Sequence, residues 1–118
     1  MQYHSEKFLI VKSIKRFILN LEVLLVNFPR KEFLTKDMVY KDALKILELV
    51  YVANEVDDTD KKRQIQVEIL GKINMLDFYL ERAYKRKYIN EKQCLAKSNE
   101  LEQITKMVYK WIKNERVC

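Results

Sequence analysis

The sequence predicts an all-α protein, an antiparallel up-down four-helix bundle that forms one domain over residues 1–118. Three observations support this prediction. Apolar residues recur at steps of three and four along four segments, which is the spacing of one buried helix face. The chain contains one Gly and one Pro, the residues that turns between strands use most often. Its 118 residues, 48% of them hydrophobic, are enough to bury one core.

The first helix is expected over residues 5–28 and the second over residues 36–54. Pro29 cannot continue a helix and disfavours helical geometry at the residue before it, which predicts a turn over residues 28–31. Thr35 is the expected N-cap of the second helix, and Asp37 in its first turn favours the helix dipole. The predicted buried face of the first helix is Ile10, Ile14, Phe17, Ile18, Leu21, Leu25 and Phe28. That of the second is Val39 or Tyr40, Ala43, Leu47, Val50, Tyr51 and Asn54.

The third helix is expected over residues 61–87 and the fourth over residues 91–114. An acidic stretch, residues 55–60, breaks the periodicity before the third helix and supplies turn and cap residues. Asn90 and Gln93 form the signature of a capping box before the fourth. The predicted core faces are Ile69, Ile73, Leu76, Leu80 and Ala83 in the third helix, and Cys94, Leu101, Ile104, Val108, Trp111 and Ile112 in the fourth. Short connections between long helices favour antiparallel neighbours.

Two of the helices carry a second apolar face. By the rotation of about 100° per residue, these residues lie away from the predicted core. They are Leu19, Val23 and Val26 in the first helix and Val67, Gly71, Met75 and Phe78 in the third. A glycine within a helix costs about 1 kcal/mol relative to alanine, which is tolerable where another backbone approaches closely. The faces predict a homo-oligomer, although isolated apolar residues are also common on protein surfaces.

The positive charge is concentrated in the third helix. The chain has a net charge of +6, and residues 61–89 carry eight cations against three acids, a net of +5. We consider these cations candidate nucleic-acid contacts, because cations mixed with aromatic rings can hold phosphates and stack bases. They are Lys61, Lys62, Arg63, Lys72, Arg82, Lys85, Arg86 and Lys87. Alternatively, they form a solvated helix face, and the last of them complement the helix dipole.

No motif for catalysis is found, so we expect no enzyme, no metal, no cofactor and no small-molecule substrate. The chain lacks a glycine-rich loop and a cysteine pair, and its single histidine, His4, has no partner nearby in sequence. Cys94 is expected to be a small core residue. Two cysteines, Cys94 and Cys118, make no disulfide framework, which indicates a reducing compartment. The only apolar run near the N-terminus, Phe8–Val11, is too short for a signal peptide or a membrane span, so we expect a cytoplasmic protein.

Two groups of residues carry a resemblance to a known family. The first comprises Asn27-Phe28-Pro29-Arg30, Phe33, Thr35, the run Ala43–Val50 and Ala53-Asn54. The second comprises the run Leu76–Leu80, Ala83-Tyr84, the run Lys87–Asn90, and Trp111 after Glu102 and Met107. Together they resemble the Avd-like four-helix bundle proteins, the accessory variability determinants of diversity-generating retroelements, over nearly the whole chain.

This resemblance implies a non-catalytic protein that assembles into a basic pentameric barrel. It also implies two kinds of partner, the retroelement reverse transcriptase and the RNA or DNA that is copied during mutagenic reverse transcription. The alternative is a structural module that oligomerises or binds another protein without contacting nucleic acid. Its cations would then belong to a solvated surface.

Overall fold

The computed structural model describes the backbone of residues 6–117 and the side chains of residues 9–115. The predictions for His4, for Cys118 and for a helix start at residue 5 lie outside this range. The described residues form four α-helices and a short 3₁₀ turn, with no strand among them. The elements are α1 (Glu6–Leu25), η1 (Arg30–Glu32), α2 (Phe33–Glu55), α3 (Thr59–Lys85) and α4 (Glu91–Val117). The all-α class and the four helices are therefore confirmed.

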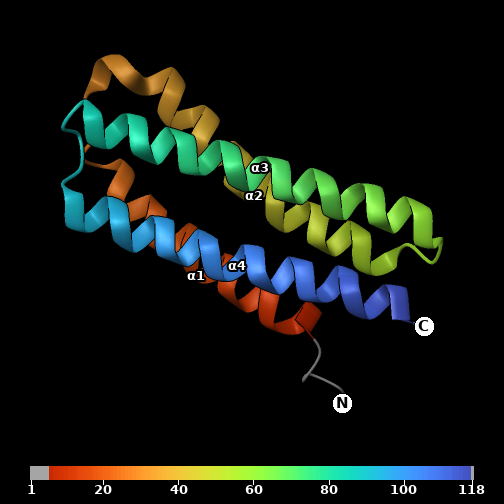
Figure 1. Cartoon of the computed structure of the whole chain (residues 1–118). Coiled ribbons are helices and arrows are strands. Elements are labelled where there is room, and N and C mark those ends of the chain that lie inside the picture. Colours follow the sequence, from red (N-terminus) through yellow and green to blue (C-terminus); the bar gives the residue numbers. More distant parts are fainter. Residues whose placement is uncertain (1–5, 118) are drawn as a thin grey trace.

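The four helices lie side by side in an elongated molecule measuring 47 × 24 × 23 Å (Figure 1). α1 packs against α2 and α4, and α3 packs against the same two helices. In the diagonal pairs, α1 with α3 and α2 with α4, no Cα atoms of described residues lie within 8 Å of each other. Each helix thus has two neighbours and one outward side.

The connection between α1 and α2 differs from the prediction at both ends. α1 ends at Leu25 rather than at residue 28, because Asn27 and Phe28 donate backbone hydrogen bonds only three residues back. Pro29 is extended, and the η1 turn then leads directly into α2 at Phe33. The predicted N-cap, Thr35, is wrong, since this residue lies inside the first turn of α2. α2 also extends one residue beyond the predicted end.

The start and the end of α3 are set by local hydrogen bonds. Asp58 Oδ1 accepts from the backbone N–H groups of Asp60 and Lys61 at 2.9 and 3.2 Å, so α3 begins at Thr59, two residues before the predicted start. α3 ends at Lys85, two residues before the predicted end. Lys87 follows with φ 66°, in the left-handed region.

This left-handed residue closes α3 with a Schellman motif. The Tyr88 N–H donates to Ala83 O and the Lys87 N–H donates to Tyr84 O, both at 2.9 Å. A non-glycine residue in this conformation costs about 1–2 kcal/mol. The motif therefore presents a lysine at a position that usually favours glycine.

The predicted capping box at the start of α4 is confirmed. The Gln93 N–H donates to Asn90 Oδ1 at 2.8 Å, and the Asn90 N–H donates to Gln93 Oε1 at 2.9 Å. α4 begins at Glu91 as predicted but continues to Val117 rather than ending at residue 114. The reciprocal bonds satisfy two backbone donors at the helix start.

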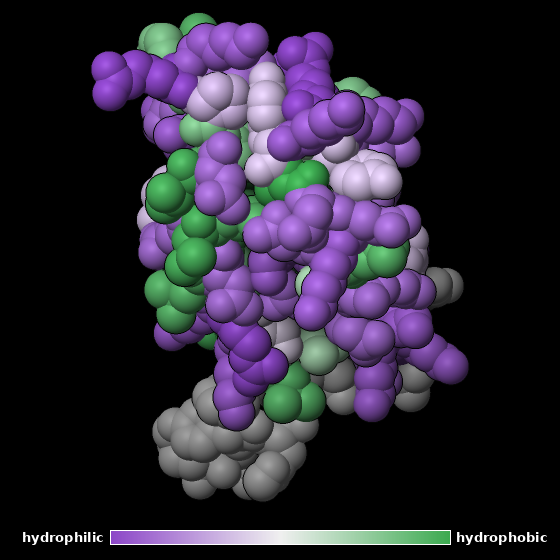
Figure 2. Space-filling model, turned by 90° about the vertical axis from the view of Figure 1, so that its left-hand side faces the viewer, coloured by the Kyte–Doolittle hydropathy of each residue, from purple (hydrophilic) through white to green (hydrophobic). Residues whose placement is uncertain are grey.

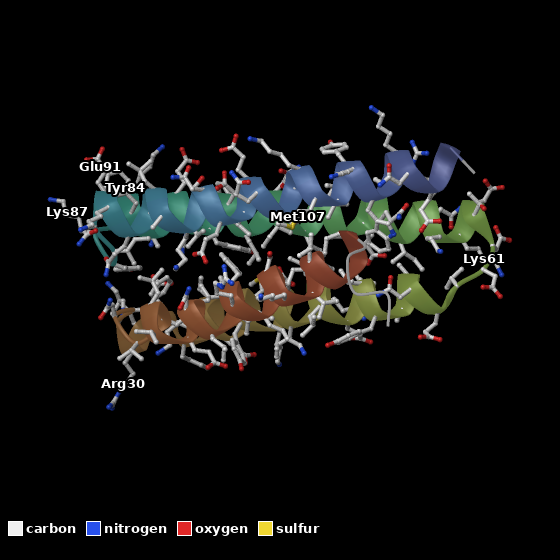
Figure 3. The ribbon with its side chains drawn as sticks, turned by 90° about the horizontal axis from the view of Figure 1, so that it is seen from below. Arg30, Lys61, Tyr84, Lys87, Glu91 and Met107 are labelled. Carbon is white, nitrogen blue, oxygen red and sulfur yellow. The ribbon has the colours of Figure 1, made fainter. Side chains whose placement is uncertain are left out.

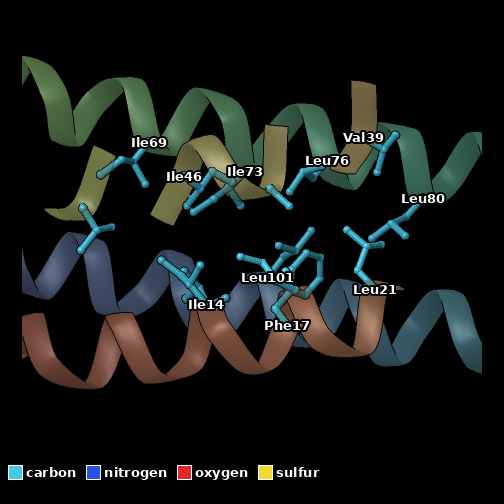
Figure 4. Packing of buried hydrophobic residues seen from close by; sticks show 14 of the residues in the cluster. Ile14, Phe17, Leu21, Val39, Ile46, Ile69, Ile73, Leu76, Leu80 and Leu101 are labelled. Carbon is cyan, nitrogen blue, oxygen red and sulfur yellow. The ribbon is translucent and has the colours of Figure 1, made fainter. Parts of the chain in front are cut away.

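The core lies between the four helices (Figure 4). All of the inward residues predicted for α1 and α3 are buried, as are those for α4 except Cys94, which is half-buried. The predicted face of α2 is partly wrong. Leu47 and Asn54 are half-buried and Tyr51 is exposed, whereas Ile46, Leu49 and Ala53 are buried instead. The reason is that α2 carries apolar residues on several sides, so two registers of the 3.6-residue repeat fit its sequence.

Candidate nucleic-acid interface

The eight predicted nucleic-acid contacts do not form one surface. Lys61, Lys62 and Arg63 lie at the start of α3, Lys72 lies in its middle, and the other four lie at its end. The 27 residues of α3 rise about 40 Å at 1.5 Å per residue. Figure 3 shows Lys61 and Lys87 at opposite ends of the molecule. These cations therefore belong to at least two separate sites.

The group at the start of α3 is surrounded by acids. Residues 54–65 carry three cations against four acids, a net charge of −1. Lys62 also forms an ion pair with Glu115 of α4 at 3.6 Å, where its side chain is only 13% exposed. The connection before α3 therefore adds no net positive charge for a phosphate chain to meet.

The group at the end of α3 surrounds a buried carboxylate, Glu32. Its side chain is 10% exposed, and it lies 3.7 Å from the Arg82 guanidinium and 3.6 Å from that of Arg86. The Tyr88 hydroxyl donates a hydrogen bond to Glu32 Oε2 at 2.8 Å. The cluster of Glu32, Arg82, Arg86 and Tyr88, which we call the Glu32 cluster, joins η1 to α3 and to the connection before α4.

The surroundings of Glu32 favour its charged form. The hydrogen bond from Tyr88 lowers the pKa of Glu32 most, and a hydrogen bond from Thr35 and the charges of Arg82 and Arg86 lower it further. Loss of solvation acts in the opposite direction but is outweighed, so the pKa stays below its ordinary value of 4.5. Arg82 and Arg86 thus compensate a buried negative charge, which reduces what they can offer to phosphate.

Sequence reasoning did not find Glu32. Tyr88 lies 56 residues further along the chain, so no local spacing signals the contact. One weak signal exists, since a lone acid stands between the cations of η1 and the apolar start of α2. A charge in such a position needs a partner if it is buried.

Five of the eight predicted cations have a carboxylate partner. The pairs are Lys62 with Glu115, Lys72 with Asp42, Lys85 with Glu81, and Arg82 and Arg86 with Glu32. Lys61, Arg63 and Lys87 have no carboxylate within 4.0 Å in the part of the chain with described side chains. The same holds for Arg30 and Lys31, two exposed cations of η1 that the sequence analysis did not select.

Positive charge accumulates where the two longer connections meet. Two contacts hold residues 26–37 against residues 81–92. One is the Glu32 cluster, and the other joins the rings of Phe28 and Tyr88, whose centroids are 5.4 Å apart. Together these segments contain eight cations and four acids, a net charge of +4. Figure 2 views the bundle from this end, and hydrophilic residues cover most of it. This end is the best candidate for binding a polyanion.

The residues predicted to form an oligomer interface are all exposed. The exposed fractions of the six side chains run from 46% for Met75 to 77% for Val26. Gly71 is exposed too, and a Cβ built on it would meet no atom within 4 Å, so packing within one chain does not require glycine there. The full set is Leu19 and Val23 on α1, Val26 directly after it, and Val67, Gly71, Met75 and Phe78 on α3.

The α3 face continues onto α2, which sequence reasoning missed. The Tyr79 hydroxyl lies 2.9 Å from Met38 Sδ of α2, and the rings of Phe78 and Tyr79 are 5.9 Å apart. Leu34, one turn before Met38, is 68% exposed. The α1 face lies on a different side, because α1 and α3 occupy diagonal positions. One chain therefore has two separate apolar surfaces.

The described residues contain no group of three or more His, Cys, Asp or Glu side chains that could hold a metal ion. Within the same range, none of the helices has an apolar stretch long enough to cross a membrane.

No protein-family model matches the chain, and no curated protein or solved structure matches it either. The resemblance to the Avd-like proteins stays a prediction from the residues.

Proposed function

We propose that this chain is a non-catalytic, oligomeric accessory protein of the cytoplasm that binds nucleic acid and a retroelement reverse transcriptase. Its role would be to support diversity-generating mutagenic reverse transcription. The observation that carries the nucleic-acid part is the net charge of +4 at one end of the bundle, where Arg30, Lys31 and Lys87 are exposed. The sequence resemblance alone supports the reverse transcriptase as partner. A reverse-transcriptase gene and a paired template repeat and variable repeat beside this gene would support the reverse transcriptase as a partner.

Self-association belongs to the same proposal. In an up-down bundle, the outward sides of α1 and α3 point in opposite directions, so the α1 face of one copy can meet the α3 face of the next. Such a contact between two different surfaces closes into a ring when the rotation between copies permits it. The resemblance supports five copies. The exposed fractions of Val23 and Phe78, 72% and 53%, support an interface at these faces.

The dependence of binding on salt tests the nucleic-acid part. We expect the affinity of the full chain for RNA or DNA to fall by at least tenfold between about 50 and about 200 mM salt, because phosphate contacts release counterions. Fluorescence anisotropy with a labelled oligonucleotide measures this. Binding that stays equally tight over this range would show that phosphate contact is not the mechanism.

One observation favours the alternative, a protein-interaction module without nucleic-acid binding. Five of the eight predicted cations are already paired, and two of them compensate Glu32 inside the fold. Under this alternative, the full chain self-associates but binds neither RNA nor DNA at low salt. The same anisotropy measurement therefore separates the two functions.

A further inference from the structure

The cations at the basic end of the bundle differ in how much of their charge is available. Arg82 and Arg86 are held by Glu32 at 3.7 and 3.6 Å. Arg30, Lys31 and Lys87, in contrast, are exposed, and no described carboxylate lies within 4.0 Å of them. Uncompensated positive charge is thus presented by η1 and by Lys87, two residues after the end of α3, whereas Arg82 and Arg86 contribute less.

Exposed aromatic rings lie at the same end. Phe33, the first residue of α2, is 62% exposed, and Tyr84 in the last turn of α3 is 40% exposed. Figure 3 shows Tyr84 beside Lys87, and Arg30 on the other half of the same end. At this exposure the ring of Phe33 is accessible to a ligand.

The Glu32 cluster fixes the backbone segments that carry these groups. Glu32 is the last residue of η1, so its contacts with Arg82, Arg86 and Tyr88 tie the η1 turn, which carries Arg30 and Lys31, to the end of α3. The Schellman motif fixes the backbone of Lys87 with two hydrogen bonds of 2.9 Å. A backbone held in place in this way loses less conformational freedom when a ligand arrives.

We propose that Arg30, Lys31, Phe33, Tyr84 and Lys87, which we call the end face, bind single-stranded nucleic acid. The cations contact phosphates and the two rings stack on bases. Single strands are favoured because their bases can leave the stack and lie on a ring, whereas the bases of a duplex are covered by their neighbours. The cross-section of the molecule, 24 × 23 Å, limits the contact to a few nucleotides. This inference rests on the proposed function, whose nucleic-acid site it specifies.

The first test reverses two charges at the end face. Arg30→Glu with Lys31→Glu is compared with Lys61→Glu and Arg63→Glu, which makes the same change in net charge at the opposite end of the bundle. All four residues are exposed and lack a described carboxylate partner. With a labelled single strand of about 12 nucleotides, we expect at least tenfold weaker binding for the end-face variant and less than about threefold for the control. Circular dichroism checks that both variants fold.

The second test removes the rings. Phe33→Ala with Tyr84→Ala is compared with Tyr51→Ala and Tyr109→Ala, exposed aromatic residues that lie elsewhere on the molecule. We expect the end-face variant to lose about tenfold in affinity for the single strand and to bind a duplex of equal length as the wild type does. The control pair should bind both ligands as the wild type does.

The outcomes separate this inference from the proposed function. If the wild type binds nucleic acid but the two charge variants lose affinity equally, the end face is overturned while the proposed function stands. If the wild type binds duplex as tightly as single strand and the ring variant binds normally, the single-strand preference is overturned. If the wild type binds neither ligand at low salt, both the proposed function and this inference fail.

Discussion

The buried carboxylate of Glu32 compensates part of the positive charge that the sequence suggests for phosphate binding. Arg82 and Arg86 belong to a run that the sequence suggests for phosphate binding, yet both lie against Glu32 in the folded chain. Removing one partner from a buried ion pair leaves the other charge without compensation, which destabilises the fold. Reversing the charge of both arginines is therefore expected to lower the melting temperature as well as the affinity for nucleic acid.

The pH dependence of stability tests this role of Glu32. Because the pKa of Glu32 is lowered on folding, the carboxylate contributes stability above its ordinary pKa of 4.5, and the contribution is lost as the pH falls through the lower value of the folded protein. At about pH 7, we expect Glu32→Gln to melt at a lower temperature than the wild type. The difference should narrow as the pH falls below 4.5. Thermal melts followed by circular dichroism at several pH values measure this.

A matched control uses an exposed acid of α3. Glu81 pairs with Lys85 at 3.8 Å, but its side chain is 60% exposed, and exposed pairs contribute little stability. Glu81→Gln should therefore melt like the wild type at all of these pH values. If the melting temperature of Glu32→Gln changes with pH in the same way as that of the wild type, the Glu32 carboxylate does not contribute stability in the way described.

The helix starts that depend on hydrogen bonds between nearby residues were predicted best. The capping box of α4 and the acidic cap of α3 use hydrogen bonds between residues two or three apart, which a sequence pattern contains. The start of α2 was wrong because η1 leads into it without a side-chain cap, and its geometry depends on contacts of Glu32 far along the chain. Capping hydrogen bonds between residues two or three apart could be predicted from the sequence, whereas contacts between distant residues could not.

The register of α2 can be checked by substitution. Ile46 is 3% exposed, whereas its neighbour Leu47, which the sequence pattern favours, is only half-buried. Ile46→Ala should lower the free energy of unfolding by about 2–5 kcal/mol, because it leaves a cavity in the core. Leu47→Ala should cost about 1 kcal/mol. Chemical denaturation measures the free energy of unfolding of both variants. A larger decrease for Leu47→Ala than for Ile46→Ala would support the register predicted from the sequence instead.

For the whole molecule, the proposed ring predicts a specific response to surface substitutions. Val23→Glu disables the α1 face and Phe78→Glu disables the α3 face, so each variant alone should be a monomer by light scattering. An equal mixture should form a dimer, because one intact face remains on each copy. Leu95→Glu, at a residue of α4 that is 56% exposed, provides the control and should keep the mass of the wild type.

Other results would contradict this arrangement. If both variants keep the mass of the wild type, the two faces are not an interface. If each variant alone forms a dimer, each face meets the same face of another copy instead of the other face. Sequence analysis found the two faces from periodicity, but it did not find the extension of one of them onto α2, which needs the packing of Tyr79 against Met38.

The uneven charge of the two ends has a consequence for any assembly built through α1 and α3. The segments at one end carry a net charge of +4, and the connection at the other carries −1. Copies related by rotation about a single axis all point the same way along that axis. Such a ring would have a front and a back, and on one rim every copy would add the positive charge of residues 26–37 and 81–92. A long polyanion would meet this charge on one side of the particle.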